Sequence, residues 1–464
     1  MGPLDLINTI ADVFSEHIKC RWDQRLEWGD GLGPSDVLPQ LLDLPAEGPL
    51  SESAAQSEFI EILGRLFPEA EALRLARLYD QEGSTSLGRS IVLRVKPYQN
   101  GHWREELAVK IAGRRAIQRE IDNYLQYVDG QIGGFRGTQQ RAHAVMWQLG
   151  GIVYALIGSE LDHTQTLKEF FQSSSDRVVD DLKLIYQRLF GGLFQYWNDA
   201  ATKTHLTLWD EYRQALELNN ERLNRLQWQA EESLSFEGLQ RKVVNPLHWL
   251  KQYAAHSEML TGRQIVHGDL HSRNIFVDMN HELWLIDFER TGEGHCLRDF
   301  IELETDLKFS LLALTPAEFT LFIQMEAALL VQGDTVPAGK LPGAMPPVVQ
   351  QHPAAWRVYE AVASLREFAA VRAHPDMRDY YWGLLCQTLF VATLTHLPDE
   401  AKRRARLSAA LICERLGNGR RLTHPWPPRD LLVLPFLDIK KGSPSITVMG
   451  DYVQDKSTNI SGEM

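Results

Sequence analysis

Cysteine is scarce in this chain of 464 residues. The four cysteines lie far apart, at Cys20, Cys296, Cys386 and Cys413. No two of them have the spacing of metal ligands, and four isolated cysteines do not make a disulfide framework. We therefore expect buried free thiols and a reducing compartment, which excludes a disulfide-stabilised secreted domain.

Long apolar runs are also lacking. The longest, residues 431–437, contains a proline, and it is far shorter than the roughly 20 residues that span a bilayer. The first residues include Asp5 and no basic cluster, unlike a secretory signal peptide. These features predict a cytoplasmic protein with no membrane partner.

Positive charge is in deficit, with 48 Lys and Arg against 61 Asp and Glu and a net charge of -13. Such a balance argues against broad binding to nucleic acid, which requires a positive surface. One stretch is locally basic, residues 402–421. We interpret it as the solvated face of a helix.

The composition is that of a globular protein, with 44% hydrophobic and 23% charged residues. The length is too great for one ordinary domain. We divide the chain into an N-terminal helical extension, a small lobe rich in strands, a large helical lobe and a disordered polar tail. These parts are residues 1–70, 71–157, 158–439 and 440–464.

Periodicity in the first third of the chain changes from helical to strand-like. Helices are predicted over residues 3–22 and 57–67, separated by a Gly/Pro-rich stretch at 29–49. The patterns then predict a small, mostly antiparallel sheet with one helix. Its strands are expected at 73–79, 91–95, 106–111, 143–149 and 152–157, and its helix at 114–128.

The rest of the chain is mainly helical in pattern. Helices are predicted at 167–172, 177–200 and 206–233 and beyond residue 299, with a strand-turn-strand at 275–286. A Pro/Gly-rich loop at 333–353 interrupts the later helices. Together, the two patterns predict an α+β fold with two lobes.

The most informative segment runs from Ile265 to Glu289. Asp269 and Asn274 stand five residues apart in a loop that ends at a strand, and alternating apolar residues then form a hairpin. The hairpin returns the chain so that Asp287 can approach the other two. Two carboxylates and an amide oxygen would thus converge, and hard oxygen ligands of this kind suit Mg²⁺.

Phosphoryl transfer needs such a group. A protein catalyses it by positioning an in-line attack and neutralising phosphate charge, with little covalent chemistry of its own. One carboxylate would orient the acceptor hydroxyl and accept its proton, while the other carboxylate and the amide would hold the metal.

The segment resembles the catalytic loop of the aminoglycoside and choline phosphotransferase branch of the protein-kinase-like superfamily, with His-Gly-Asp-x-x-x-x-Asn followed by Ile-Asp-Phe. The resemblance implies Asp269 as catalytic base, Asn274 and Asp287 as metal ligands, and His267 as the structural histidine of the catalytic loop. His271, also in this loop, could reach substrate or phosphate, or only form hydrogen bonds within the loop. Gly268 replaces the arginine of protein kinases, and no Ala-Pro-Glu follows, which favours a constitutively arranged site.

The small lobe supplies candidates for nucleotide binding. Lys110 lies on a predicted strand and Glu120 on the following helix, the pair that this fold directs at the α and β phosphates. Lys110 could equally be a surface lysine, and Glu105, Glu106 and Arg119 offer other pairings. Gly83, Ser84 and Thr85 begin a connection whose backbone N–H groups could cap the phosphates, although a Gly/Ser turn is also an ordinary hairpin connector.

A narrower resemblance links the chain to the kinase-like ternary complex associated domain proteins of bacterial conflict systems. It rests on Leu-Ala-Val-Lys-Ile-Ala and on Ile-Asp-Phe-Glu-Arg-Thr-Gly-Glu-Gly-His, with Asp-Phe-Ile-Glu-Leu-Glu after it. Asp299 in this last run is expected to be structural and to fix the loop.

Three functions stay open on the sequence alone. The first is an enzyme that uses ATP or GTP with Mg²⁺ to phosphorylate a hydroxyl of a small molecule. The second is a kinase-fold nucleotide-binding or interaction module in a conflict or signalling complex, with weak or no catalysis and a protein partner at the N-terminal extension or the tail. The third is a nucleotidyl or protein-modifying transferase on the same fold.

Overall fold

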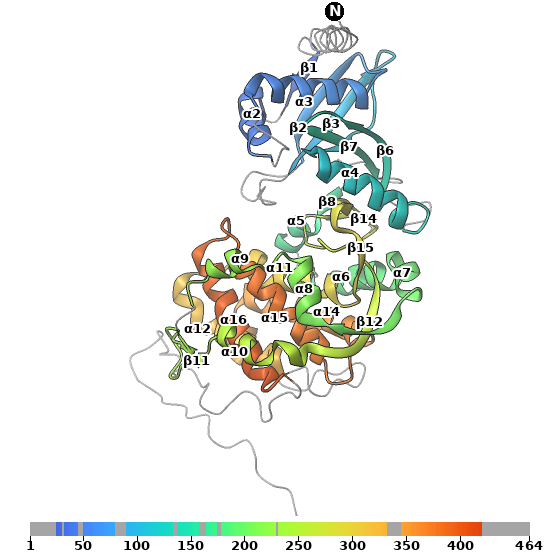
Figure 1. The fold of residues 1–464 in the computed structure, drawn as a ribbon. Helices are drawn as coiled ribbons and strands as arrows, with labels where there is room; N and C mark the ends of the chain where they lie inside the picture. The colour runs from blue at the N-terminus through green and yellow to red at the C-terminus, as the bar shows by residue number, and fades with distance from the viewer. Residues whose placement is uncertain are drawn as a thin grey trace, which may run out of the picture.

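The computed structural model describes residues 25–29, 32–44, 50–78, 90–132, 138–156, 164–173, 178–228, 231–331 and 345–419. The helix expected at 3–22, the connection at 83–88, the junction at 157–158 and the tail from 440 lie outside these residues. The described chain forms two lobes, a strand-rich N-lobe and a larger helical C-lobe (Figure 1). The expected α+β class is confirmed.

One sheet forms the centre of the N-lobe, with strand order β1-β2-β3-β5-β7-β6 and β4 paired with β3. All neighbouring strands are antiparallel except β1 and β2. Residues 26–28, expected in the helical extension, therefore extend this sheet. The strands are β1 (Leu26–Trp28), β2 (Ala72–Arg77), β3 (Ser90–Gln99), β4 (His102–Trp103), β5 (Leu107–Gly113), β6 (Thr138–Val145) and β7 (Leu149–Leu156).

Helices cover both faces of this sheet. The helices α2 (Pro34–Leu42) and α3 (Glu52–Leu66) share one apolar core with the sheet, and α4 (Arg114–Asn123) packs with the other core, which continues into the C-lobe. Ser51 caps α3, accepting a hydrogen bond from Ala54 N at 3.3 Å. The Glu58 carboxylate of α3 accepts the backbone N–H of Leu149 at 2.8 Å and so fixes α3 against β7.

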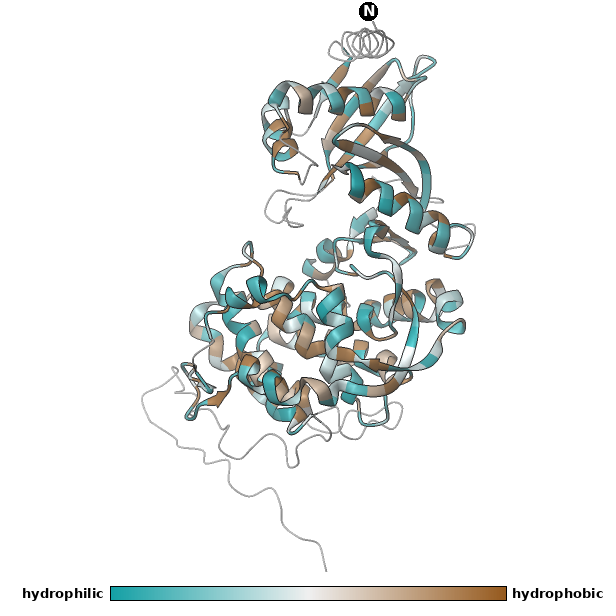
Figure 2. Ribbon diagram, in the orientation of Figure 1, coloured by the Kyte–Doolittle hydropathy of each residue, from teal (hydrophilic) through white to brown (hydrophobic). Residues whose placement is uncertain are grey.

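The C-lobe is built of helices around a second apolar core (Figure 2). Its longer helices are α11 (Arg298–Asp306), which continues into a π-helical turn η7 (Leu307–Leu311), and α12, α14, α15 and α16. Their bounds are Phe319–Val331, Pro353–Ala370, Arg378–Ala392 and Asp399–Leu416. The other helices are α5 (Leu167–Gln172), α6 (Val178–Tyr186), α7 (Gln195–Asp199), α8 (Leu208–Ala215), α9 (Asn220–Asn224), α10 (Pro246–Tyr253) and α13 (Pro347–Gln350).

Two short three-stranded sheets hold the loop of residues 267–274. The expected hairpin forms from β13 (Ile275–Asp278) and β14 (Leu283–Leu285), with Ile275 opposite Leu285. β8 (Thr164–Thr166) pairs with β13 on its other side. β12 (Glu258–Val266) leads into the loop and pairs with β9 (Thr202–Thr207) and β15 (Gly292–His295). The sheet with β8 and β14 lies where the lobes meet, and β12 of the other sheet runs along the C-lobe (Figure 1).

The basic stretch at 402–421 is a solvated face only in part, since Lys402, Arg403 and Arg406 are partly exposed and residues 420–421 lie outside the described chain. The expectation was wrong for two arginines of α16. Arg404 and Arg415 of α16 are 6% and 0% exposed. Their guanidinium groups donate to the carbonyl oxygens of Leu312 and Leu330 at 2.9 and 3.1 Å. The arginines on this face therefore connect α16 to the ends of two neighbouring helical segments.

The expected helix over 206–233 is interrupted. The chain instead forms β9, α8 and α9, and residues 233–244 carry a two-stranded ribbon of β10 (Ser233–Leu234) and β11 (Val243–Val244). The stretch at 29–49, read as an interruption, contains α2. Among the described helices, none combines the length and the apolar character needed to cross a bilayer.

Candidate active site

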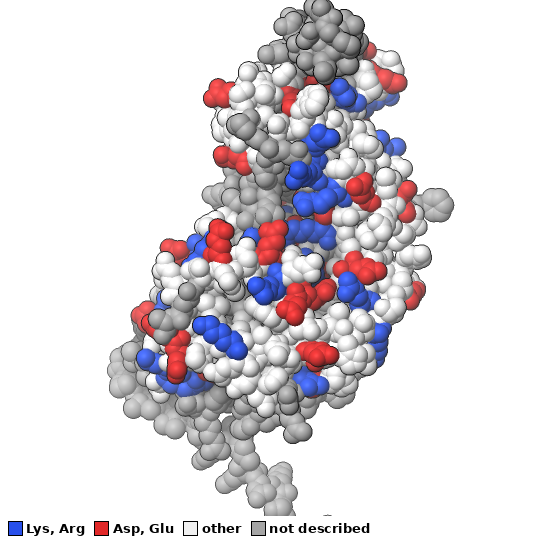
Figure 3. Space-filling model, viewed as in Figure 1, with Lys and Arg blue, Asp and Glu red and all other residues white. Residues whose placement is uncertain are grey.

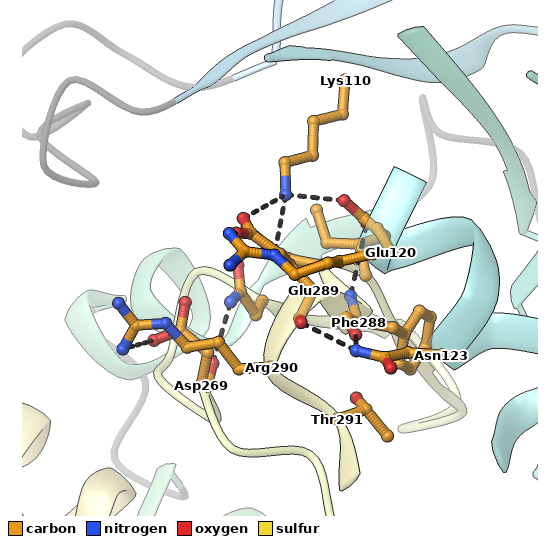
Figure 4. Close-up of polar contacts among 12 residues, drawn as sticks. Lys110, Glu120, Asn123, Asp269, Phe288, Glu289, Arg290 and Thr291 are labelled. Carbon is orange, nitrogen blue, oxygen red and sulfur yellow. Dashed lines mark hydrogen bonds and ion pairs between the residues drawn. The ribbon is translucent and has the colours of Figure 1, made fainter. Parts of the chain in front are cut away.

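Lys110 reaches the boundary between the lobes from the middle strand of the N-lobe sheet. Because side chains alternate along β5, Val109 and Ile111 enter the core against α3, while Lys110 lies on the opposite face. Its ammonium group contacts Glu120 Oε2 and Asp287 Oδ1, both at 2.7 Å, and lies 3.8 Å from Glu289 Oε2 (Figure 4). The N-lobe and C-lobe therefore meet at a buried cation.

Glu120 is the buried partner of this lysine, as the sequence predicted. Its other oxygen accepts a hydrogen bond from the Tyr154 hydroxyl at 2.5 Å and one from Phe288 N at 3.3 Å. Burial lowers the pKa of Lys110, but the three neighbouring carboxylates outweigh burial and raise it, so the lysine is charged. Two of the alternative residues have other partners, since Glu106 contacts Arg94 at 3.2 Å and Arg119 contacts Glu289 at 2.5 Å. The third, Glu105, is exposed.

Asp287 and Asn274 lie at the end of the β13–β14 hairpin that faces the N-lobe. Ile286 N donates to Asn274 O at 3.1 Å, which closes the hairpin beside both residues. Asp287 adopts a left-handed backbone with φ of 69°. The Asn274 amide donates from Nδ2 to Asp269 O at 2.9 Å, so Asn274 also fixes the backbone of the preceding loop.

Three carboxylates of one helical segment hold this loop through its backbone. Asp299 accepts the N–H groups of His267 and Gly268 at 2.8 and 2.9 Å. One turn on, Glu302 accepts Leu270 N at 3.2 Å, and Asp306 accepts Ser272 N at 2.8 Å. The structural role expected for Asp299 is thus confirmed and extends to two further acids.

Asp269 projects into the cleft beside a guanidinium. Arg290 Nη1 lies 3.7 Å from Asp269 Oδ1, and both side chains remain about one-quarter exposed. Burial disfavours the charge of Asp269, but the nearby positive groups, Arg290 first among them, outweigh burial and lower its pKa to about 2. Gly268, just before it, has φ of 77° and lies against the carbonyl of Arg290, a position that only glycine fits.

The two histidines of the loop are placed differently. His267 is fully buried, its Nε2 lies 3.1 Å from Ile286 O, and it lines neither of the two cavities that contain Lys110. Burial lowers its pKa, so it is a neutral link between the loop and the hairpin. His271 Nδ1 accepts Arg273 N at 3.3 Å while its ring lines the cleft.

Two adjoining cavities meet at Lys110, His271 and Asp287. The first extends under the N-lobe sheet and includes Asn274, Ala108, Tyr154 and Ile286. The second extends into the C-lobe and includes Asp269, Arg290 and the end of α15. Basic and acidic side chains alternate where the lobes meet (Figure 3).

The residues present fit a magnesium ion that takes most of its ligands from phosphate and water. Oδ1 of Asn274 and Oδ2 of Asp287 accept no hydrogen bond from any described residue, and both side chains line the first cavity. Within the described ranges, no three His, Cys, Asp or Glu side chains are grouped to hold a metal alone. One carboxylate and one amide oxygen match the few protein contacts that Mg²⁺ usually accepts.

Several residues of the site were missed from the sequence alone. Glu289 and Arg290 were read only as part of a motif, yet they lie next to Lys110 and Asp269. Asn123 of α4 donates to the carbonyl oxygens of Phe288 and Glu289 at 3.2 and 2.8 Å, and so ties the N-lobe helix to the segment after Asp287. The nucleotide candidates Gly83, Ser84 and Thr85 lie outside the described residues.

Comparison with known families gives one match. Residues 213–398 match the family described as ternary complex associated domain 9. This range contains the loop of residues 267–274, the hairpin and α11 to α15. The match covers less than half of the chain, so the narrower resemblance is confirmed only for the run from Ile286 onwards, and Leu-Ala-Val-Lys-Ile-Ala lies outside it. The two lobes, with their strand lysine, helix glutamate and hairpin, form a protein-kinase-like fold. No curated protein matches the chain.

Solved structures of small-molecule kinases are similar at a low level. The aminoglycoside phosphotransferase APH(3'')-Id from Streptomyces rimosus has 14% identity and a TM-score of 0.32, with 67% of this chain and 97% of that chain covered. Choline kinase LicA from Streptococcus pneumoniae has 12% identity and a TM-score of 0.33, covering 76% and 98%. A thermostable mutant of APH(4)-Ia has 10% identity and a TM-score of 0.40, covering 76% and 97%. The fold assignment therefore rests on the strands, helices and cleft of this chain.

Proposed function

We propose that this protein is a phosphotransferase that moves the γ-phosphate of ATP or GTP to a hydroxyl of a small molecule. One observation carries the proposal. A buried lysine of the N-lobe contacts a helix glutamate and a hairpin aspartate, and the cleft at that point also contains Asn274 and Asp269. Phosphoryl transfer from a nucleotide to a hydroxyl uses this combination of cation, metal ligands and base.

Different residues of the chain would bind the phosphates and the metal ion. Lys110, held by Glu120, would bind the α and β phosphates, and Gly83, Ser84 and Thr85 would cap them with backbone N–H groups. Asn274 and Asp287 would hold Mg²⁺, which when bound neutralises charge on the phosphates. Because Asp287 contacts Lys110 through Oδ1 only, Oδ2 stays available for the ion.

Asp269 would act on the acceptor. With a pKa of about 2 it is ionised at neutral pH, so it can accept the hydrogen bond of the acceptor hydroxyl and orient its oxygen towards the γ-phosphorus. The new O–P bond forms as the bond to the β–γ bridging oxygen breaks, and the hydroxyl proton passes to the Asp269 carboxylate. A carboxylate of low pKa is a weak base, so orientation is its main contribution.

The second cavity is the candidate acceptor site. Its lining is polar at Thr305, Asp306 and Ser310 and apolar at Phe390, Val391, Leu394 and Leu397. His271 lines both cavities and would lie between nucleotide and acceptor. An acceptor with a hydroxyl beside Asp269 and an apolar part against α15 would fit these walls.

The alternative is a nucleotide-binding or interaction module in a conflict or signalling complex. The name of the matched family, which refers to a ternary complex, favours it. Both functions include nucleotide binding, so the test must separate binding from turnover.

The test uses the purified full chain with MgATP and a library of alcohols, followed by mass spectrometry of the acceptors. We expect one class of alcohol to gain phosphate with the wild-type protein. Asp269→Asn should abolish this gain while nucleotide binding persists. The exposed control Asp122→Asn on α4 should behave as wild type. Gain of AMP would instead indicate nucleotidyl transfer. Nucleotide binding with no modified acceptor would favour the module, and absence of nucleotide binding would overturn the proposal.

A further inference from the structure

The wall of the first cavity includes residues from the N-terminal extension. Leu32, Val37 and Gln40 line the same cavity as Lys110 and Asp287. Val37 and Gln40 belong to α2, which lies beside β2 at the edge of the N-lobe (Figure 1). The extension therefore contributes directly to the cleft in which we place the nucleotide.

The segment is attached to the sheet by defined contacts. β1 pairs in parallel with β2, and Gly29 N donates to Leu75 O at 2.8 Å. Trp28 stacks on Phe59 of α3, with ring centroids 6.5 Å apart. These contacts hold the chain that precedes α2 against the sheet.

α2 is also anchored on the sheet itself. Val37 and Leu41 are each 2% exposed and share an apolar core with Leu93 of β3. Asp36 lies 3.5 Å from Arg77, the last residue of β2. Because apolar packing and an ion pair both hold it, α2 is a fixed wall of the cavity.

The chemistry of this wall differs from that of the phosphate end. Lys110 and Asp287 supply charge to the cavity, whereas the residues from α2 and its neighbours combine apolar side chains with the Gln40 amide and the Arg77 guanidinium. Gln40 Nε2 donates to Asp36 O at 2.9 Å, and its Oε1 accepts no hydrogen bond from the described residues. An apolar surface with one free amide oxygen suits a nucleoside, whose base and ribose carry donors on a flat or apolar frame.

We propose that α2 forms part of the nucleoside-binding side of the nucleotide site, with Gln40 as its polar contact and Leu32 and Val37 as its apolar contacts. This inference rests on the proposed nucleotide binding. It assigns the N-terminal extension to the nucleotide site. From the sequence alone, the extension was predicted to be helical and to bind a protein partner.

Two probes distinguish the nucleoside from the phosphates. Binding of MgATP and of magnesium tripolyphosphate is measured by calorimetry for wild type, Gln40→Ala and Ser35→Ala, the last being an exposed residue of α2 outside the cavity. We expect Gln40→Ala to raise the Kd for MgATP about three- to tenfold, the effect of one lost hydrogen bond, and to leave the Kd for tripolyphosphate unchanged. Ser35→Ala should match wild type with both probes.

The outcomes separate this inference from the proposed function. If wild type binds both probes and Gln40→Ala binds MgATP as tightly as wild type, the role of α2 is refuted and the phosphotransferase proposal stands. If Gln40→Ala weakens both probes equally, α2 acts through the fold and the inference is also refuted. If wild type binds neither probe, the proposed function itself fails. Alanine favours helices, and Gln40 is only half-buried, so the variant should fold.

Discussion

Replacing Lys110 by methionine tests the ion cluster on which the site depends. Methionine keeps most of the length of the side chain and removes its charge, leaving the carboxylates of Glu120, Asp287 and Glu289 without their shared cation. Removal of one partner of a buried ion pair costs about 3 to 5 kcal/mol. Glu120 is fully buried and Asp287 is 15% exposed, so Asp287 can regain water, and Tyr154 still donates to Glu120 at 2.5 Å. We therefore expect a loss of about 3 kcal/mol, the lower end of that range.

The assay is urea unfolding followed by tryptophan fluorescence at pH 8 and pH 5. Without the lysine, the buried carboxylates resist ionisation and their pKa rises, so the loss should be smaller at pH 5, where one of them can take up a proton. Lys96→Met is the matched control, since Lys96 lies on the neighbouring strand, is 29% exposed and has its carboxylate partner at 4.0 Å. It should stay within about 0.5 kcal/mol of wild type.

A double variant sharpens the result. Glu120→Gln in the Lys110→Met background removes the buried charge, so it should recover most of the lost stability if the penalty comes from the unpaired carboxylate. Equal stability of Lys110→Met and Lys96→Met would refute the reasoning, because the lysine would then not be neutralising buried charge. Failure of the double variant to recover stability would locate the loss in packing instead.

Three further predictions concern the loop and the C-lobe core. Arg290→Met should raise the pKa of Asp269 from about 2, so the acid limb of the kcat/KM profile should move to higher pH, and an unmoved limb would contradict the pairing. Gly268→Ala should strongly lower the melting temperature, because its φ is 77° and the new Cβ would overlap the Arg290 carbonyl. The control Gly292→Ala should match wild type, because its new Cβ would meet no neighbouring side chain or backbone atom within 4 Å. Glu304 is fully buried and two cations lower its pKa to about 2, so Glu304→Gln should lose about 3 kcal/mol at pH 7. The stabilisation by Glu304 is present above its unfolded pKa, so in urea titrations the gap should close as the pH falls from about 4 to 2.

The parts of the site that could be predicted are those in which the chemistry is local. The loop and hairpin occupy a continuous stretch, and the alternation of Ile275, Val277, Leu283 and Leu285 defines a short antiparallel pair within a few residues. Lys110 and Glu120 lie ten residues apart on a strand and the helix that follows it. Residues that are close in sequence can be arranged in few ways, so their spacing was enough to predict that they lie together.

The contacts that could not be predicted join distant parts of the chain. Lys110 and Asp287 are 177 residues apart, and the meeting of the two lobes, not any local pattern, brings them together. β9 and β12 were missed for a related reason, because a strand is stabilised by its partner and its register comes from tertiary packing. α2 was read as an interruption because of its prolines, yet Pro34 stands in its first turn, where proline is tolerated, and buried Val37 and Leu41 stabilise the helix in spite of Pro39.

The spacing of the acidic residues after the hairpin predicts how their side chains are arranged. Asp299, Glu302 and Asp306 stand at intervals of three and four, which places them on one face of a helix. In the structure this face meets four backbone N–H groups of the loop that carries Asp269, those of His267, Gly268, Leu270 and Ser272. Hydrogen bonds from N–H groups to carboxylates are stronger than neutral ones, so the helix fixes the loop as a unit. The position of Asp269 is therefore set by the C-lobe core, whereas Lys110 is set by the N-lobe sheet. It follows that relative movement of the lobes would change the distance between these two residues, and it would also break the contact of Lys110 with Asp287.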